Sequence, residues 1–239
     1  MAYGIQIYND SGFLQIDQDY TNYLLHTSGS VTSTGRAISG SDEEPDVSTV
    51  NVSGVSANDD VIFAFRPATA DGSAIRAVKT STTGQFKIYS DYAGTINWKA
   101  YKKGSLLSAP TSGYGLNVYR SDGTTLAYSS SFDIMSVATV LNVSHSTPST
   151  SVYNHSFSGL PWAIAGAFGL SAELSFWEDF ENGDNLGVAE YAHLAVAWNS
   201  STQLQAIDIT TIINGILEPS NIFGVLGQST KIGILSGYA

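Results

Sequence analysis

The sequence contains no cysteine and few charged residues, and each shortage removes a class of structure or chemistry. Without cysteine, the 239-residue chain has no disulfide, no thiolate nucleophile and no cysteine metal ligand. Charged residues make up only 13% of the chain, whereas about a quarter is usual. The helix-forming residues Lys, Glu, Met and Gln are also scarce. These shortages disfavour a helical protein and give no sign of a disulfide framework.

Ser, Thr, Gly and Tyr take the place of the missing charges. The chain has 23 Gly, 13 Tyr and a hydrophobic content of 43%, enough to bury one large core or two small ones. This mixture is typical of strands and turns. A polar surface with little charge is common where proteins pack into assemblies, and also where they bind uncharged partners such as sugars. Both interpretations stay open on composition alone.

The net charge of −11 is unevenly distributed along the chain. Nine acidic residues and one basic residue precede Arg66, and eight basic residues then stand against two acidic ones up to Arg120. Between Arg120 and Lys231 there are ten acidic residues and no Lys or Arg. The acidic sign disfavours nucleic-acid binding. The basic middle could serve head-to-tail packing of copies, docking to an unlike partner, or neutralisation within one fold.

Hydrophobic alternation and glycine turns predict an all-β protein. Its expected form is two β-sandwich-like units with short strands and Gly turns, and at most one or two short helices. The period of apolar residues predicts one of these helices over Ile209–Leu217, ending before Pro219. Strands are expected at 22–26, 47–52, 60–66, 74–78, 85–89, 95–101, 134–143, 191–198 and 204–209. The strand at 60–66 is apolar between charged ends, and we expect it to be central.

A short motif occurs twice and divides the chain. Tyr3–Gly12 reads YGIQIYNDSG and Tyr114–Gly123 reads YGLNVYRSDG, and each copy predicts a β-hairpin. A segment rich in Gly, Ala, Pro and Ser precedes the second copy. We therefore expect an N-terminal β domain over 1–110 and a C-terminal β domain over 111–239 that starts with the second hairpin.

Three further segments have a distinctive composition. Ser41–Asp46 is acidic and contains Pro45, which predicts a solvated turn. Residues 144–158 are polar and predict a loop or an edge connection. Leu160–Trp177 is the most apolar stretch, but it is too short and too interrupted to span a membrane. We expect this stretch to be buried, in the core or against a neighbouring chain.

Catalytic and metal-binding patterns are not found in the sequence. No histidine is spaced with another ligand in a zinc pattern, and no phosphate-binding glycine loop is present. His145 and His155 are expected to be exposed, and His193 to be structural in a strand. We therefore predict a non-enzymatic protein with no catalytic residues, no metal site and no cofactor.

One acidic segment is a candidate binding loop. Around a glycine turn lie Trp177, Glu178, Asp179, Glu181 and Asp184. A solvated hairpin turn is the first interpretation. Carboxylate and amide oxygens could also hold calcium, although the spacing is not that of an EF-hand. Paired carboxylates could serve glycoside hydrolysis, but neighbours in one loop seldom reach the required separation. The flanking aromatic residues favour a binding or packing surface.

The opening residues MAYGIQIYNDSG resemble the N-terminus of a group of tailed-bacteriophage tail and tail-tip structural proteins. The second copy, Tyr114–Gly123, looks like the same hairpin, and Ile62–Pro67 is also similar to a stretch in that group. The resemblance does not extend beyond Phe157. The first hairpin ends Asp17-Gln18, where many members have Asp-Ser or Asp-Thr. The group provides no catalytic residues to transfer.

The resemblance implies a structural component of a virion tail, which would associate with other copies of itself and with other phage tail proteins. The alternative is a receptor-binding module of the tail that contacts a host-surface glycan or protein. Met1-Ala2-Tyr3 leads directly into a strand pattern, so we expect synthesis in the host cytoplasm without a signal peptide. We expect no contact with nucleic acid and no membrane insertion.

Overall fold

The computed structural model shows an all-β protein, which confirms the predicted fold class. Its one helical element is the single 3-10 turn η1 (Gly104–Leu106), in the part of the chain that is described. No helix among these residues is long and apolar enough to cross a membrane. The structure describes residues 6–8, 14–17, 22–39, 42–109, 115–143, 152–156, 159–164, 170–179, 184–216 and 230–235.

One large sheet has six antiparallel strands in the order β13-β19-β15-β7-β10-β3. The strand predicted to be central, β7, pairs with β10 on one side and β15 on the other, so that prediction is confirmed. The bounds are β13 (Val137–Val143), β19 (Thr230–Leu235), β15 (Trp162–Ile164), β7 (Val61–Pro67), β10 (Ala93–Lys103) and β3 (Tyr23–Thr34).

The second large sheet has nine strands, of which seven follow the order β4-β5-β18-β17-β8-β9-β6. Two further strands, β14 and β16, pair with β18 and β17 respectively. The bounds are β4 (Ala37–Ser39), β5 (Asp42–Glu44), β18 (Gln203–Ile216), β17 (Asp184–Ser200), β8 (Ala74–Lys79), β9 (Gln85–Ser90), β6 (Asp46–Asn51), β14 (Val152–Asn154) and β16 (Leu170–Asp179).

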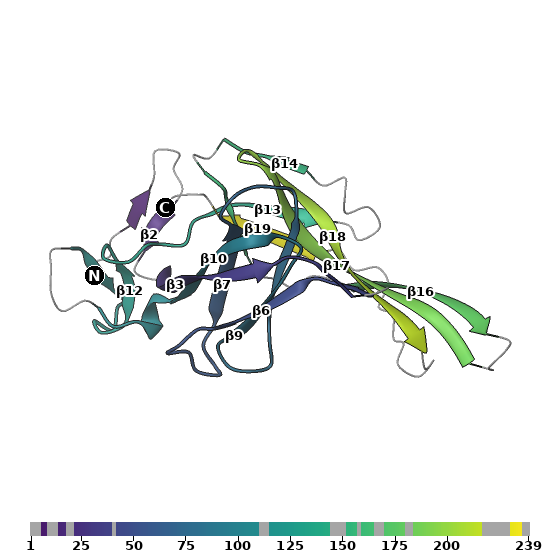
Figure 1. Ribbon diagram of the computed structural model, residues 1–239. Coiled ribbons are helices and arrows are strands. Elements are labelled where there is room, and N and C mark those ends of the chain that lie inside the picture. The colour runs from purple at the N-terminus through teal and green to yellow at the C-terminus, as the bar shows by residue number, and fades with distance from the viewer. Residues whose placement is uncertain are drawn as a thin grey trace.

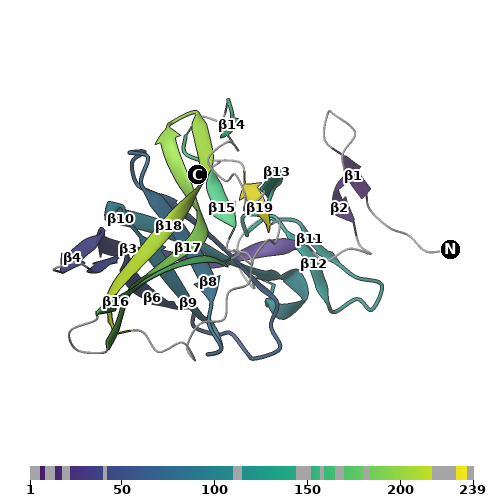
Figure 2. The ribbon, with the colours of Figure 1, turned by 90° about the vertical axis from the view of Figure 1, so that its right-hand side faces the viewer.

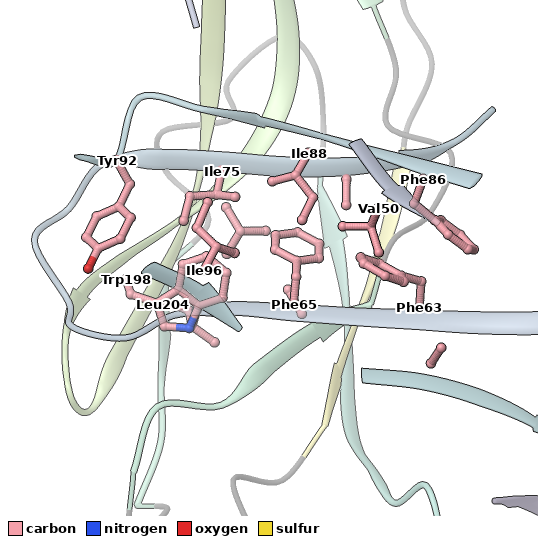
Figure 3. Close-up of a cluster of buried hydrophobic side chains, with 14 of the residues drawn as sticks. Val50, Phe63, Phe65, Ile75, Phe86, Ile88, Tyr92, Ile96, Trp198 and Leu204 are labelled. Atoms are coloured by element: carbon pink, nitrogen blue, oxygen red, sulfur yellow. The ribbon is translucent and has the colours of Figure 1, made fainter. Parts of the chain in front are cut away.

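The two large sheets enclose the main hydrophobic core, as Figure 3 shows. Phe63 and Phe65 of β7 point from one sheet toward Phe86 of β9 and Trp198 of β17 in the other. The rings of Phe63 and Phe86 stack with centroids 4.4 Å apart, and the indole Nε1–H of Trp198 donates to the carbonyl of Pro161 at 2.9 Å. Alternate residues of each strand supply this core, as the period-two pattern predicted.

The outer face of the six-stranded sheet carries a smaller core. Trp162 of β15 is 4% exposed and packs with Tyr101 and Ala64. Arg66 and Lys99 lie over its ring, at 4.4 Å and 5.0 Å from the centroid. The burial expected for the apolar stretch 160–177 is therefore found for its described start, and its remaining side chains lie outside the described residues.

The sheets join both halves of the chain. Strands β13, β15 and β19 complete a sheet with β3, β7 and β10, while β17 and β18 do so with β8 and β9. The predicted division into 1–110 and 111–239 therefore does not coincide with a division between sheets.

The helix predicted over Ile209–Leu217 is wrong, because β18 is an extended strand as far as Ile216. Apolar residues at helical spacing suggested the helix, but the segment is a run of β-branched residues with Thr210 and Thr211 at its centre. Such residues lose side-chain freedom in a helix and pack well on a pleated sheet. Pairing with β17 along almost the whole strand decides the outcome.

The acidic segment Ser41–Asp46 is not a simple solvated turn. Its residues 42–44 form β5, which pairs with β4 and touches β18 at Ile212. Pro45 is buried, and Asp46 starts β6. Only Glu44 is clearly exposed among the side chains described there. The prediction of a solvated turn is therefore wrong in part, because the residues on both sides of Pro45 pair with other strands and are extended.

Both predicted hairpins are present and share an irregularity. The first pairs β1 (Gln6–Tyr8) with β2 (Leu14–Asp17), and the second pairs β11 (Asn117–Tyr119) with β12 (Leu126–Ser129). In each hairpin the register shifts before the tyrosine that ends the first strand, as a β-bulge does. The shift falls at the same motif position in both copies. Figure 2 shows the two hairpins at the same end of the molecule, outside the large sheets.

Candidate functional site

Strands β16, β17 and β18 extend beyond the sandwich as a three-stranded arm (Figure 1). Strand β17 pairs with β8 only at Val196 and Ala197, whereas it pairs with β18 from Leu186 onward and with β16 up to its start. From Val196 to Asp184 the strand advances about 40 Å at about 3.3 Å per residue. The arm is therefore a long projection anchored at one end in the core.

The candidate binding residues lie at the far end of this arm. Trp177, Glu178 and Asp179 end β16, and Asp184 begins β17, so the structure brings these four together. Asp179 is directly opposite Asp184, and Glu178 is opposite Asn185. The fifth candidate, Glu181, lies outside the described residues. We call Glu178, Asp179 and Asp184 the arm tip.

The arm is acidic beyond its tip. Glu173 of β16 is paired with Glu190 of β17, so two register positions oppose like charges, which destabilises a strand pair. No Lys or Arg occurs between residues 120 and 231 to relieve this repulsion from within the arm. The arrangement is suited to a cationic partner.

The edge of β16 that faces away from β17 pairs with no strand in the described part of the chain. This edge is ten residues long. Unpaired N–H and C=O groups on a long edge can accept a strand from another chain. Sequence reasoning predicted a turn here but missed the length of the arm, because it depends on which strands stop pairing with the sandwich.

Arg76 was also not identified from the sequence as a buried residue. Arg76 of β8 is only 7% exposed, and none of the described residues accepts a hydrogen bond from its Nε or Nη1. Its neighbours Ile75 and Ala77 face the main core, so Arg76 lies on the outer face of the nine-stranded sheet. Its guanidinium carbon is 4.8 Å from the centre of the Tyr89 ring. Burial lowers the pKa of Arg76 from its ordinary value, although an arginine stays charged.

A second charged cluster joins the ends of β3, β7 and β10. The ammonium of Lys102 donates to Asp59 at 2.8 Å and to the carbonyl of Gly54 at 2.8 Å, and only 6% of the lysine side chain is exposed. Lys103 pairs with Asp60 at 3.2 Å, and the Tyr23 hydroxyl also donates to Asp60. Every charge in this cluster has a partner, so the cluster is not an open binding site.

The Asp59–Asp60 cluster shifts several pKa values. Lys102, through its hydrogen bond, lowers the pKa of Asp59, and the Tyr23 hydrogen bond lowers that of Asp60. Burial, followed by the hydrogen bond to Asp60, raises the pKa of Tyr23 to about 12. These shifts favour the ionised carboxylates and the neutral phenol that the hydrogen bonds require.

The histidines do not form a metal site among the described residues, which contain no group of three or more potential His, Cys, Asp or Glu ligands. His193 lies within β17, as expected for a strand position. His155 was predicted to be exposed, but it is half-buried and stacks on Tyr153 with ring centroids 6.2 Å apart. Burial lowers its pKa. His145 lies outside the described residues.

No known protein family, curated protein or solved structure matches the chain.

Proposed function

We propose that this protein is a non-enzymatic structural subunit of a tailed-bacteriophage virion, located in the tail or tail tip and assembled with other copies or other tail proteins. The three-stranded arm is the observation that carries the proposal. It projects from a well-packed sandwich, which fits a subunit that reaches a neighbour better than an enzyme that encloses a substrate.

The unpaired edge and the acidic residues of the arm support association with another chain over a monomeric state. A ten-residue edge on β16 that pairs with no described strand is the kind of edge that proteins cover or pair. Opposed acidic residues along the same arm would repel one another until a basic surface neutralises them. The arm lacks Lys and Arg, and all ten of these residues lie in the rest of the chain, so another copy offers cations that the arm itself does not have.

The doubled hairpin supports the assignment to a virion tail. Its Tyr-Gly motif resembles phage tail and tail-tip proteins, and both copies adopt the same strand pairing with the same register shift. The described strands of the two hairpins, β1, β2, β11 and β12, contain Asp17 as their one acidic residue and no histidine. Both therefore serve as scaffold in the proposal, and recognition is left to the arm.

A receptor-binding module of the tail is the second candidate. Trp177 beside three acidic positions at the end of a long projection is suited to contact with a host-surface glycan or protein. The two roles differ in when the arm is needed. A structural subunit needs its arm while the tail is built, whereas a receptor-binding module needs it only when the finished particle attaches to the host.

The test uses the phage that encodes the chain. Immunogold labelling of purified particles is expected to mark the tail. A phage whose arm is shortened by removing the opposed segments from Ser175 to Val188 is expected to yield particles with defective tails. Intact particles that fail to adsorb would favour the receptor-binding candidate. Absence of the chain from purified particles would refute both.

A further inference from the structure

Arg76 is a cation for which the described residues provide no salt-bridge partner. It is more than nine-tenths buried, and two of its guanidinium nitrogens have no acceptor among the described residues. Removing such donors from water without replacing their hydrogen bonds is costly. Stacking on Tyr89 compensates only in part, because the ring offers a cation–π contact and no hydrogen bond to Nε or Nη1. The position is therefore suited to a ligand that supplies oxygen acceptors.

The part of the chain that the structure describes does not supply the missing anion. Asp91 follows β9 on the same face of the sheet, but its carboxylate is engaged by Arg36 at 3.0 Å. The other cation on this face of β9 is Lys87, which adds positive charge near Arg76. Among the described residues on the outer face of the nine-stranded sheet, positive charge therefore exceeds negative charge around Arg76.

The acidic tip of the same copy cannot reach Arg76. Ala195 precedes Val196, which pairs with the neighbour of Arg76 in β8, and Asp184 starts the same continuous strand. Eleven residues of extended strand hold the tip about 36 Å from this point. Neutralisation within one copy, one of the possibilities that the charge distribution left open, is excluded for this pair of sites.

We infer that Arg76 receives a carboxylate from the arm tip of a second copy, Glu178, Asp179 or Asp184, in a head-to-tail contact. The inference rests on the proposed function as an assembling subunit and names the contact by which copies assemble. An arginine fork donates to a carboxylate in a bidentate manner, through Nη2 together with either Nε or Nη1, so one carboxylate supplies an acceptor to one of the two unpartnered nitrogens. The contact joins unlike surfaces, so it generates rings or filaments instead of closed symmetric dimers.

The test measures self-association of the purified full-length protein by sedimentation velocity. Arg76→Met removes the guanidinium but keeps a long apolar stem against Tyr89. A tip variant combines Glu178→Gln, Asp179→Asn and Asp184→Asn, far from the core. Each is expected to weaken association roughly 30-fold or more, the effect of losing one partner of a buried charge pair. Arg120→Met, which removes an equal charge from an exposed turn, is the matched control and is expected to associate like the wild type.

Mixing the two variants gives a result that a folding defect cannot imitate. The Arg76→Met copy keeps its tip, and the tip variant keeps its Arg76, so one productive contact remains possible between them. The mixture is expected to form heterodimers that grow no further, while each variant alone stays monomeric. The inference is overturned if the wild type is monomeric at its highest soluble concentration, if the tip variant associates like the wild type, or if the mixture forms no dimer.

These outcomes are separate from the test of the proposed function. A chain that is found in virions but associates without Arg76 would refute the inference alone. A chain that associates through Arg76 but is absent from particles would refute the virion assignment and keep the contact.

Discussion

Substituting Gly84 by alanine adds only one methyl group, but it should destabilise the sandwich strongly. Gly84 lies in the turn that precedes β9, with a backbone φ of 68°. Its carbonyl accepts a hydrogen bond from the amide of Val52 at 2.8 Å, which holds the turn against the end of β6. A Cβ added at Gly84 would lie 2.6 Å from the carbonyl oxygen of Val52. That atom belongs to the backbone and cannot rotate away.

Two contributions determine the size of the effect. The left-handed backbone conformation costs an alanine roughly 1–2 kcal/mol relative to glycine. Relieving the contact with the Val52 carbonyl requires a backbone shift, for which overpacking gives about 1–3 kcal/mol. We therefore expect Gly84→Ala to lower the free energy of unfolding by about 2–5 kcal/mol. For a domain of this size, this corresponds to a fall of roughly 4–20 °C in Tm.

Gly72→Ala is the matched control. Gly72 also has a positive φ, 82°, but the nearest atom to its added Cβ is Oδ1 of Asn199 at 3.5 Å, an ordinary contact. Only the conformational cost of roughly 1–2 kcal/mol should remain. Urea unfolding of the three proteins, followed by tryptophan fluorescence, measures the difference. Equal losses at Gly84 and Gly72 would refute the reasoning, because the close approach to Val52 would then contribute nothing.

Two further predictions concern the core and its pH dependence. Trp198→Phe removes the indole donor to Pro161 and leaves a cavity, so unfolding should become easier by about 2–4 kcal/mol in a urea titration; an unchanged midpoint would contradict this. Burial is the main cause that raises the pKa of Tyr23 and of Tyr101 from 10.0 to about 12. The folded state then keeps phenol protons that the unfolded state loses, so the stability they contribute is complete below pH 10 and is lost as the pH rises toward 12. Thermal unfolding across this range should show a smaller decline in Tyr101→Phe, and an equal decline in both proteins would contradict the assignment.

Local pattern was enough to predict most strands. In β9 and β10 the alternation of Phe86, Ile88 and Ile96 with polar residues identified the buried face, and these three side chains are at most 2% exposed. The error at Ile209–Leu217 arose where helical and extended spacing both matched an apolar run. Pairing with β17, which local periodicity cannot show, determined the strand.

For the candidate site too, features set by neighbouring residues could be predicted from the sequence, and features set by long-range strand pairing could not. The hairpin that pairs the end of β16 with the start of β17 could be predicted because its acidic residues and glycine are neighbours in sequence. The isolation of Arg76 could not, because it arises from the pairing of β8 with β9 on one side and with β17 on the other. Residue 76 is separated from its β17 neighbours by about half of the chain, and no local pattern reports such a contact.

Strand β17 runs continuously from the core, past the outer face of the nine-stranded sheet that carries Arg76, to the arm tip. Val196 and Trp198 fix one end of the strand in the core, Ala195 lies on the face that carries Arg76, and Asp184 starts the strand at the arm tip. A copy therefore presents a cation and an anionic tip at a fixed separation that it cannot close itself. In the inferred head-to-tail contact, an open chain of copies leaves one Arg76 and one tip unpaired, whereas a ring leaves none. Because an unpaired buried charge is costly, closed rings should be favoured over open filaments wherever the contact angle permits closure.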